Sequence, residues 1–331
     1  FSPLGHREAY MVDQTERRVV ITGLGVVAAN GIGKGAFWQA TSKGISGIKP
    51  IQRIPTDDIE ISVAGEVSDF LATDYIDRKL IKRTDRMTHF VFAAVQEAVL
   101  DARLTLAEED SHRLGVVIAN TMGGMGCALE QISELHRRGP RYLSAFTALA
   151  WLPVANAGQL SIRHAFQGYS KTPVNDTVGG LDALGIAYRA IRRGAADILI
   201  AGGCEAFLEP FVLLTLVYKG HLLASDDPRA YRPFDRRAAG LLPGEGAGIC
   251  ILEDYEHAQR RDAPIYGEIV GYGQTNDAHG LLAPSFDGKQ YARAIQLAMQ
   301  EGGLRAKDIG YFSLDGHALP ASDQGEAEGL H

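Results

Sequence analysis

Four short apolar runs that do not alternate with polar residues constrain the fold of this chain most strongly. They span Arg18–Thr22, Gly115–Ala119, Asp197–Ala201 and Gly248–Leu252. An alternating strand has one solvated face, whereas a continuous apolar run is covered on both faces. Because helices provide that cover, the runs predict an α/β fold in which helices flank a mixed, largely parallel sheet.

The segments between these runs carry the spacing of helices and of further strands. Residues 86–104 place Met87, Phe90, Val91 and Ala94 at helical intervals, which predicts a long helix with a wide apolar face. Further helices are expected from Gly124 to Glu134, from Leu181 to Gly194, over 289–301 and from Asp323, and further strands near Pro173–Asn175, over Ile265–Gly273 and at Tyr311–Leu314.

Charge and cysteine content exclude several classes of function. Lys and Arg number 33 against 40 Asp and Glu, a net charge of −7, and neither half is basic enough for nucleic acid or an anionic membrane. The three cysteines, Cys127, Cys204 and Cys250, lie far apart and the histidines do not cluster, so we expect no disulfide framework and no metal. Such a chain fits the cytoplasm.

Residues 1–11 lack a signal-peptide core, and we interpret them as a leader or tag that ends at the expected initiator, Met11.

A glycine pattern after the first run suggests a nucleotide site. Gly23-Leu-Gly25-Val-Val-Ala28 matches the G-x-G-x-x-A fingerprint of dinucleotide-dependent oxidoreductases. The fingerprint also needs a helix at its third position and an acidic residue about 20 positions further on. Gly31 and Gly33 extend the loop instead, and no acid stands at the required place. The sequence therefore favours a structural tight turn at Gly23.

Two segments carry candidate chemistry. Thr177 joins a strand to a helix, where a side chain is exposed and the helix N-terminus favours negative charge. A Thr hydroxyl needs a base to become a nucleophile, and a helix N-cap explains the same residues without catalysis. His317 follows the run at Tyr311–Leu314 and is an acid–base candidate, although a structural His is as compatible with a loop. Together the two residues define one alternative, a self-sufficient acyltransferase or condensing enzyme.

Four motifs in register resemble the β-ketoacyl synthases, the condensing enzymes of fatty-acid and polyketide assembly. The resemblance runs from about Arg17 to the C-terminus, and its motifs are Val19–Val27, Ala201–Ala206, Arg232–Arg236 and Pro243–Gly248. It implies the thiolase fold, an αβαβα sandwich of two similar mixed-sheet halves that forms dimers. We expect a ketosynthase-like N-terminal half over 12–258 and an incomplete, truncated C-terminal half over 259–331.

The departures from the family pattern concern its catalytic residues. Alignment of Gly180–Gly185 puts Thr177 at the position of the nucleophilic Cys. Counting back eight residues from Asp323 puts Asp315, not His317, at the position of the first catalytic His. Loss of both groups is similar to the chain-length factor, or ketosynthase β, of type II polyketide synthases, which the segments Asp176–Leu184 and Ser313–Pro320 also resemble. That subfamily usually has Gln at position 177, so the Thr makes a decarboxylase role less expected here.

The resemblance implies a non-catalytic subunit with no cofactor of its own. Its partners would be a Cys-bearing ketosynthase α subunit, in a heterodimer, and an acyl carrier protein that delivers acyl and malonyl groups on phosphopantetheine. The subunit would close the far end of the tunnel into which the chain grows. Its wall is expected at Met125, Cys127, Ala128 and Gln131, where small side chains suit a long tunnel and core packing equally well.

Overall fold

The computed structural model describes residues 16–220, 222–280 and 285–331. The predicted leader over residues 1–11, with Met11, lies outside the described residues. Among the described residues, no helix has both the length and the apolar character needed to cross a lipid bilayer.

The secondary structure is a mixture of short and long elements. The strands are β1 Val19–Ala28, β2 Gly31–Ile32, β3 Lys49–Pro50, β4 Val63–Ala64, β5 Leu114–Ala119, β6 Ser170–Lys171, β7 Ile198–Glu205, β8 Gly246–Asp254 and β9 Gly267–Ile269. The α-helices are α1 Lys34–Ser42, α2 Arg78–Ile81, α3 Arg86–Asp101, α4 Met125–Arg138, α5 Thr147–Trp151, α6 Ala155–His164, α7 Gly179–Arg192, α8 Pro210–Tyr218, α9 Tyr255–Arg260, α10 Lys289–Glu301 and α11 Pro320–Leu330.

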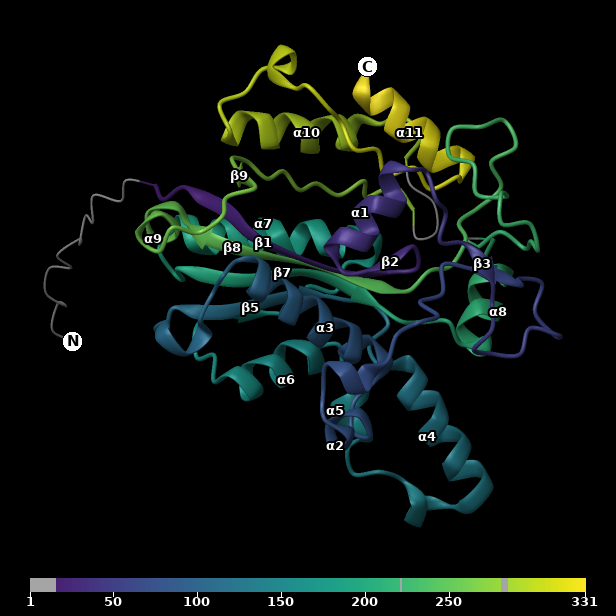
Figure 1. Cartoon of the computed structure of the whole chain (residues 1–331). Helices are drawn as coiled ribbons and strands as arrows, with labels where there is room; N and C mark the ends of the chain where they lie inside the picture. The colour runs from purple at the N-terminus through teal and green to yellow at the C-terminus, as the bar shows by residue number, and fades with distance from the viewer. Residues whose placement is uncertain (1–15, 221, 281–284) are drawn as a thin grey trace, which may run out of the picture.

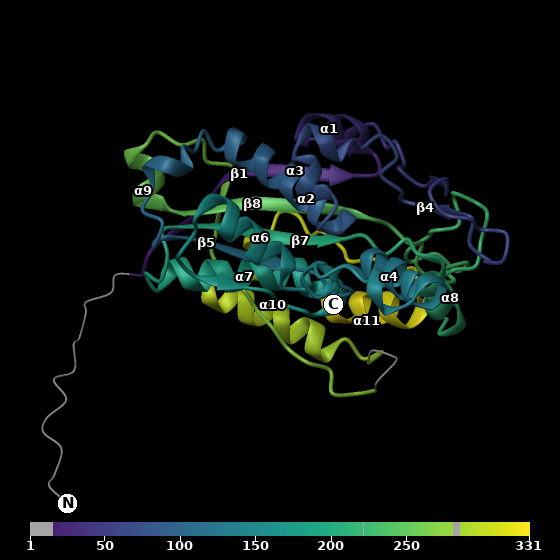
Figure 2. The same ribbon diagram turned by 90° about the horizontal axis from the view of Figure 1, so that it is seen from below.

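One mixed sheet organises the described residues. Its strands run in the order β2-β1-β8-β7-β5-β6, with β9 paired to the amino end of β1 on the same edge as β2. Figure 2 shows β1, β8, β7 and β5 side by side. The expected mixed sheet is confirmed, but its largely parallel character is not, because only the pairs β5–β6 and β5–β7 are parallel.

The two faces of the sheet are covered by different helices, as continuous apolar runs require. Along β5, Val116 and Ile118 point into the core with α3 and α6, whereas Val117 and Ala119 point toward α7. In Figure 1, α3 and α6 lie below the sheet and α7 lies above it, beneath α10. Tyr188 and Arg192 of α7 bond to Val270 and Glu301, so α7 is sandwiched between the sheet and the C-terminal half.

The glycines after the first run do not form the tight turn that the sequence suggested. β1 continues through Gly23 and Gly25 to Ala28, with a bulge between Ile21 and Gly23. A Cβ on Gly25 would lie 1.8 Å from the carbonyl oxygen of Ala94, and one on Gly23 would lie 2.2 Å from that of Ala98. The glycines are therefore needed for the close approach of α3 to an extended strand.

Other strand boundaries also differ from prediction. β7 extends through the glycines at 202 and 203 to Glu205, because β8 pairs with it along its whole length. The strand expected near Pro173–Asn175 is instead β6, three residues earlier, where Ser170 and Lys171 pair with β5.

The C-terminal half contains the helices that the sequence predicted but fewer residues in strands than predicted. α10 matches the predicted helix over 289–301, and α11 begins at Pro320, three residues before the predicted start. The strand expected over Ile265–Gly273 is reduced to β9, and the one expected at Tyr311–Leu314 is coil with exposed side chains. No described strand lies beside 311–314 to accept and donate its backbone hydrogen bonds, which explains why that prediction was wrong.

Candidate functional site

Thr177 lies at the junction that the sequence predicted, beside the carboxyl ends of two central strands. It occupies the short 3₁₀ turn Asp176–Val178, which leads directly into α7. A Cβ on Gly179 would lie 3.1 Å from the Cβ of Ala119, and one on Gly180 would lie 4.0 Å from Gly203, so the first turn of α7 sits against the ends of β5 and β7. The Thr177 side chain is exposed in this chain. A group here would face the N-terminus of a 14-residue helix.

A buried carboxylate ties this junction to the C-terminal half. Asp182, in the first turn of α7, accepts hydrogen bonds from the side chains of Asn175 and Tyr272 and, at 3.2 Å, from Gln274. Desolvation and the Asp182 carboxylate raise the pKa of Tyr272 well above its usual range, so its hydroxyl remains a donor at neutral pH. Asp176 adopts a left-handed φ of 45°, which Asp tolerates better than most residues.

The chain presents no activated thiol. Burial raises the pKa of Cys204 well above its ordinary value and that of Cys250 to about 11. Burial and, secondarily, the nearby Asp85 carboxylate also raise the pKa of Cys127. None of the three therefore has the lowered pKa that activates a nucleophilic Cys.

His317 lies in the loop before α11, and the loop is held by one carboxylate of that helix. Glu326 accepts the backbone N–H groups of Asp315 and Gly316 at 2.7 and 2.9 Å. Nε2 of His317 is 3.0 Å from the Asp315 carboxylate, within ion-pair distance but not aligned for a hydrogen bond. Asp315 raises the pKa of His317 despite partial burial, which favours the protonated ring over the neutral form that a general base requires.

The structure does not support Thr177 and His317 as a catalytic pair. None of the hydrogen bonds and ion pairs described over 16–220, 222–280 and 285–331 joins them, and the His317 ring is turned to Asp315. The self-sufficient acyltransferase considered from the sequence therefore lacks the base that a Thr nucleophile needs. The oxidoreductase alternative fails at Gly23, because the fingerprint segment is strand rather than a phosphate-binding turn.

The four predicted tunnel residues lie on the first two turns of α4. Ala128 is the one buried residue of this helix, whereas Met125, Cys127 and Gln131 are half-buried. Gln131 accepts the backbone N–H of Ser144 at 2.8 Å, which fixes its amide against the segment after the helix. Further along, Ile132 and Leu135 are exposed, and α4 projects from the body of the molecule (Figure 1).

Two carboxylates that the sequence reasoning missed, a buried one and a half-buried one, hold the start of α4 and the loop before it. Asp85 caps α3 and also accepts the backbone N–H of Cys127 at 2.9 Å. Glu205, the last residue of β7, accepts those of Thr121 and Met122 at 2.9 and 3.1 Å. The position of Asp85 before an apolar helix was a readable N-cap signal, but its second contact links segments 42 residues apart in sequence.

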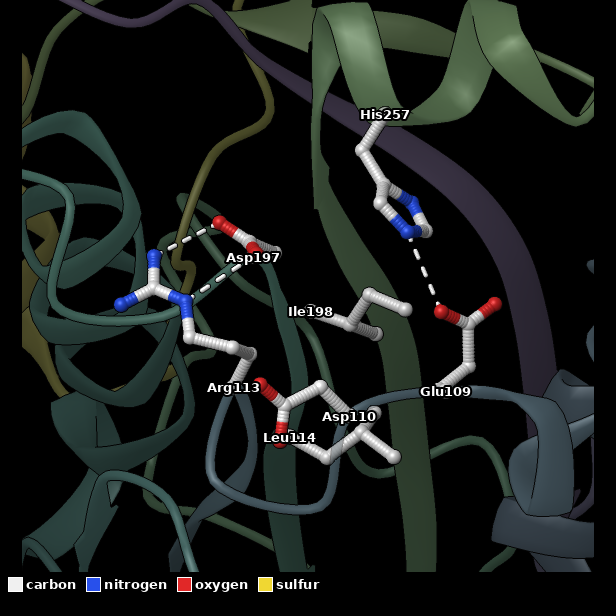
Figure 3. A pocket seen from close by; sticks show the side chains of 7 residues that line it. All are labelled: Glu109, Asp110, Arg113, Leu114, Asp197, Ile198 and His257. Atoms are coloured by element: carbon white, nitrogen blue, oxygen red, sulfur yellow. Dashed lines mark hydrogen bonds and ion pairs between the residues drawn. The ribbon is translucent and has the colours of Figure 1, made fainter.

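A small polar cavity of about 40 Å³ lies at the opposite end of the sheet, beside the amino ends of β5 and β7 (Figure 3). Arg113 bonds to Asp197 on one side, and His257 contacts Glu109 and Glu253 at 3.1 and 2.6 Å on the other. Hydrogen bonds from Arg113, and then from Arg17, lower the pKa of Asp197 to about 2. The charged side chains around the cavity are paired with one another, so we interpret them as a structural ion-pair cluster and not as a second ligand-binding site.

Comparison with known families covers nearly the whole chain. The family "Beta-ketoacyl synthase, N-terminal domain" matches residues 16–258, and "Beta-ketoacyl synthase, C-terminal domain" matches residues 266–331.

Similar proteins include a ketoacyl synthase beta subunit and a 3-oxoacyl-[acyl-carrier-protein] synthase. The chain is 40% identical to the "Tetracenomycin polyketide synthase ketoacyl synthase beta subunit" of Streptomyces glaucescens, over 94% of this chain and 76% of that protein. It is 37% identical to "3-oxoacyl-[acyl-carrier-protein] synthase 2" of Staphylococcus aureus, over 95% and 76% of the two chains. Among solved structures, "The ishigamide ketosynthase/chain length factor" superposes with a TM-score of 0.87 at 30% identity, over 95% of this chain and 77% of that one.

Proposed function

The chain belongs to the β-ketoacyl synthase family and has its thiolase-like fold, and from that premise we propose that it is the non-catalytic, chain-length-determining subunit of a condensing complex. In this role it pairs with a Cys-bearing ketosynthase, which condenses acyl groups with malonyl units delivered on an acyl carrier protein. The observation that carries the proposal is Thr177 at the strand–helix junction, where the family's chemistry requires an activated thiol.

The surroundings of Thr177 support a subunit without condensing chemistry of its own. Burial, complete for Cys204 and partial for Cys127 and Cys250, makes all three thiols of the chain less acidic than an ordinary Cys. At the position of the first family His stands Asp315, whose backbone is held by Glu326 and whose carboxylate faces His317. An ionised carboxylate only accepts hydrogen bonds, so it cannot replace an imidazole N–H that donates to a thioester carbonyl.

Exposed apolar side chains support a protein partner. They lie on consecutive segments from α4 to the first turn of α7, and they include Ile132, Leu149, Trp151, Leu152, Val154, Val174, Val178 and Leu181. Large apolar side chains that stay exposed on neighbouring segments are typical of surfaces that bind another protein. β6 is also the last strand at its edge of the described sheet, next to the same segments. We assign this surface to the ketosynthase partner.

Chain length is set in this proposal by the space that α4 leaves. Each methylene that cannot be buried forfeits about 0.8 kcal/mol, and one that overlaps a side chain costs more. Ala128 and Cys127 leave more room than a large side chain at either position. The complex would therefore make longer products than one with an aromatic residue at 128.

Reconstitution tests the proposal. The isolated chain should give no condensation with acyl- and malonyl-carrier proteins, and addition of a ketosynthase with an intact Cys should restore it. In that complex, Ala128→Phe should shorten the product measured by mass spectrometry. Ser133→Phe adds the same ring at an exposed position of α4 and should not. Condensation by the isolated chain, or an acyl adduct on Thr177, would refute a non-catalytic role.

A further inference from the structure

The start of α4 is held by side chains rather than by the helix itself. Cys127 lies in the first turn, where a backbone N–H has no acceptor four residues earlier. Among the described hydrogen bonds its acceptor is Oδ2 of Asp85, at 2.9 Å. Oδ1 of the same carboxylate accepts the N–H of Met87 at 2.9 Å. One carboxylate thus joins the first turns of α3 and α4.

The loop before α4 leaves little freedom for adjustment around this contact. Gly124 donates to the Trp151 carbonyl at 2.9 Å, and a Cβ on it would lie 2.1 Å from the Ala150 carbonyl oxygen. A Cβ on Gly126 would lie 3.1 Å from Oε1 of Glu209 and in ordinary contact, at 3.4 Å, with Oδ2 of Asp85. Asp85 is itself only 4% exposed, so water does not replace a lost partner easily.

We propose that Asp85 is a positioning residue that fixes the α4 wall and thereby helps to set the length of the chain the complex makes. The inference rests on the proposed function, since it assigns the wall to α4. Beyond its first turns the helix exposes Ile132 and Leu135, so the location of Cys127 and Ala128 depends on how the first turn is held. If the first turn of α4 could move away from the growing chain, the tunnel would accommodate additional malonyl-derived units.

Replacement of the Asp85 carboxylate by an amide should remove one of its two hydrogen bonds. Both oxygens of Asp85 accept an N–H, and an Asn side chain has one oxygen and an NH₂ group that would face a donor. Glu205 differs, because a single oxygen accepts from both Thr121 and Met122, and its other oxygen has only a 3.4 Å contact with Ala206. A Gln at 205 can turn its oxygen toward the loop and keep both short bonds.

The test is product length in the reconstituted complex, with hydrogen exchange as a second readout. Asp85→Asn should shift the products toward longer chains and lower the protection of the Cys127 amide about tenfold, as expected for loss of one buried hydrogen bond. Glu205→Gln should leave both readouts unchanged. Asp254→Asn is the matched control, because Asp254 is a similarly buried helix cap, on α9.

The outcomes separate the two proposals. If Ala128→Phe shortens the product while Asp85→Asn leaves its length unchanged, the positioning role is wrong and the proposed function stands. If Asp254→Asn lengthens the product as much as Asp85→Asn, general destabilisation is the cause and the positioning role is again wrong. If none of the α4 variants changes product length, the proposed function itself fails.

Discussion

The two halves of the chain begin alike. In the N-terminal half, Gly23 and Gly25 bring β1 against the carbonyl groups of Ala98 and Ala94 in α3. In the C-terminal half, Cβ atoms on Gly271 and Gly273 would lie 2.1 and 1.9 Å from the carbonyl oxygens of Ala298 and Ala294 in α10. In both places two glycines that are two residues apart pack against the carbonyl groups of two alanines that are one helical turn apart. This repeated packing is the structural form of the two similar halves that the sequence predicted.

The halves then diverge at the next apolar run. After α3 and a 3₁₀ turn at Leu106–Glu108, β5 is buried throughout between β6 and β7. After α10 and a 3₁₀ turn at Ala306–Asp308, residues 309–314 are exposed coil. An apolar run becomes a strand when neighbouring strands satisfy its backbone groups, so hydrophobicity alone does not decide its conformation.

The largest expected loss of stability comes from a substitution that disrupts the glycine–helix packing shared by the two halves. Gly25→Val would place a side chain within 1.8 Å of the Ala94 carbonyl, between two elements of the main core, and should cost about 4 kcal/mol or more of unfolding free energy. Gly273→Val meets Ala294 at 1.9 Å, but it lies in coil that can move, so we expect about half that cost. Urea denaturation measures both. Equal costs would show that the C-terminal half is held as firmly as the sheet.

A second pair of variants compares the two divergent runs. Ile118→Ala removes a fully buried side chain from β5 and should cost about 3 kcal/mol. Leu314→Ala changes a side chain that is 49% exposed and should cost less than about 1 kcal/mol. The two midpoints in urea give the difference directly. A larger loss for Leu314→Ala would mean that residues 309–314 are packed in solution, contrary to the structure.

How far the sequence predicted the fold follows from the same comparison. β5, α3 and α10 were predicted well, because burial on both faces or on one helical face leaves a periodic pattern. Gly23, Gly202 and Tyr311–Leu314 were misjudged, because whether a glycine ends a strand, or an apolar run forms one, depends on neighbours distant in sequence.

The candidate site divides in the same way. Thr177 was placed correctly at the start of a helix, because helix starts have a local signature, whereas the strand expected directly before it ends earlier, at Lys171. Asp85, Glu205 and Asp182 were missed as site residues, because their partners lie 42, 84 and 90 positions away. Their function is a property of the packed structure rather than of any local pattern.

A smaller effect concerns the contact between the halves. Asp182→Asn keeps the shape of the side chain, but it places an NH₂ group against donors from Asn175, Tyr272 or Gln274. We expect a loss of about 1–2 kcal/mol and faster hydrogen exchange around residues 270–275, with β5 and β7 unchanged. Asp176→Asn, an exposed neighbour, is the control. Uniformly faster exchange throughout the sheet would show that Asp182 supports the whole fold rather than the contact.

The smallest expected effect is the pH dependence of the ion pairs at the amino ends of β5 and β7, a feature that the uncharged run 309–314 lacks. Arg113 and Arg17 hold the folded pKa of Asp197 at about 2, below its ordinary value of 3.8. A lowered folded pKa contributes stability that is complete above the ordinary value and is lost as pH falls toward 2. Because the pair is partly exposed, we expect Asp197→Asn to cost about 1 kcal/mol at pH 6 and almost nothing at pH 2.

The pKa of His257 is shifted in the opposite direction, so its contribution to stability changes with pH in the opposite sense and provides a second test. Glu253, and then Glu109, raise its folded pKa above the ordinary 6.5, so its contribution is complete below that value and is lost as pH rises through the folded pKa. His257→Gln should therefore cost most near pH 5 and least near pH 9, whereas Asp197→Asn costs the same at both. Denaturation midpoints of the two variants over this range measure the difference. If His257→Gln destabilised the protein equally at both pH values, a hydrogen-bonded neutral ring, rather than an ion pair with Glu253, would hold α9 against the sheet.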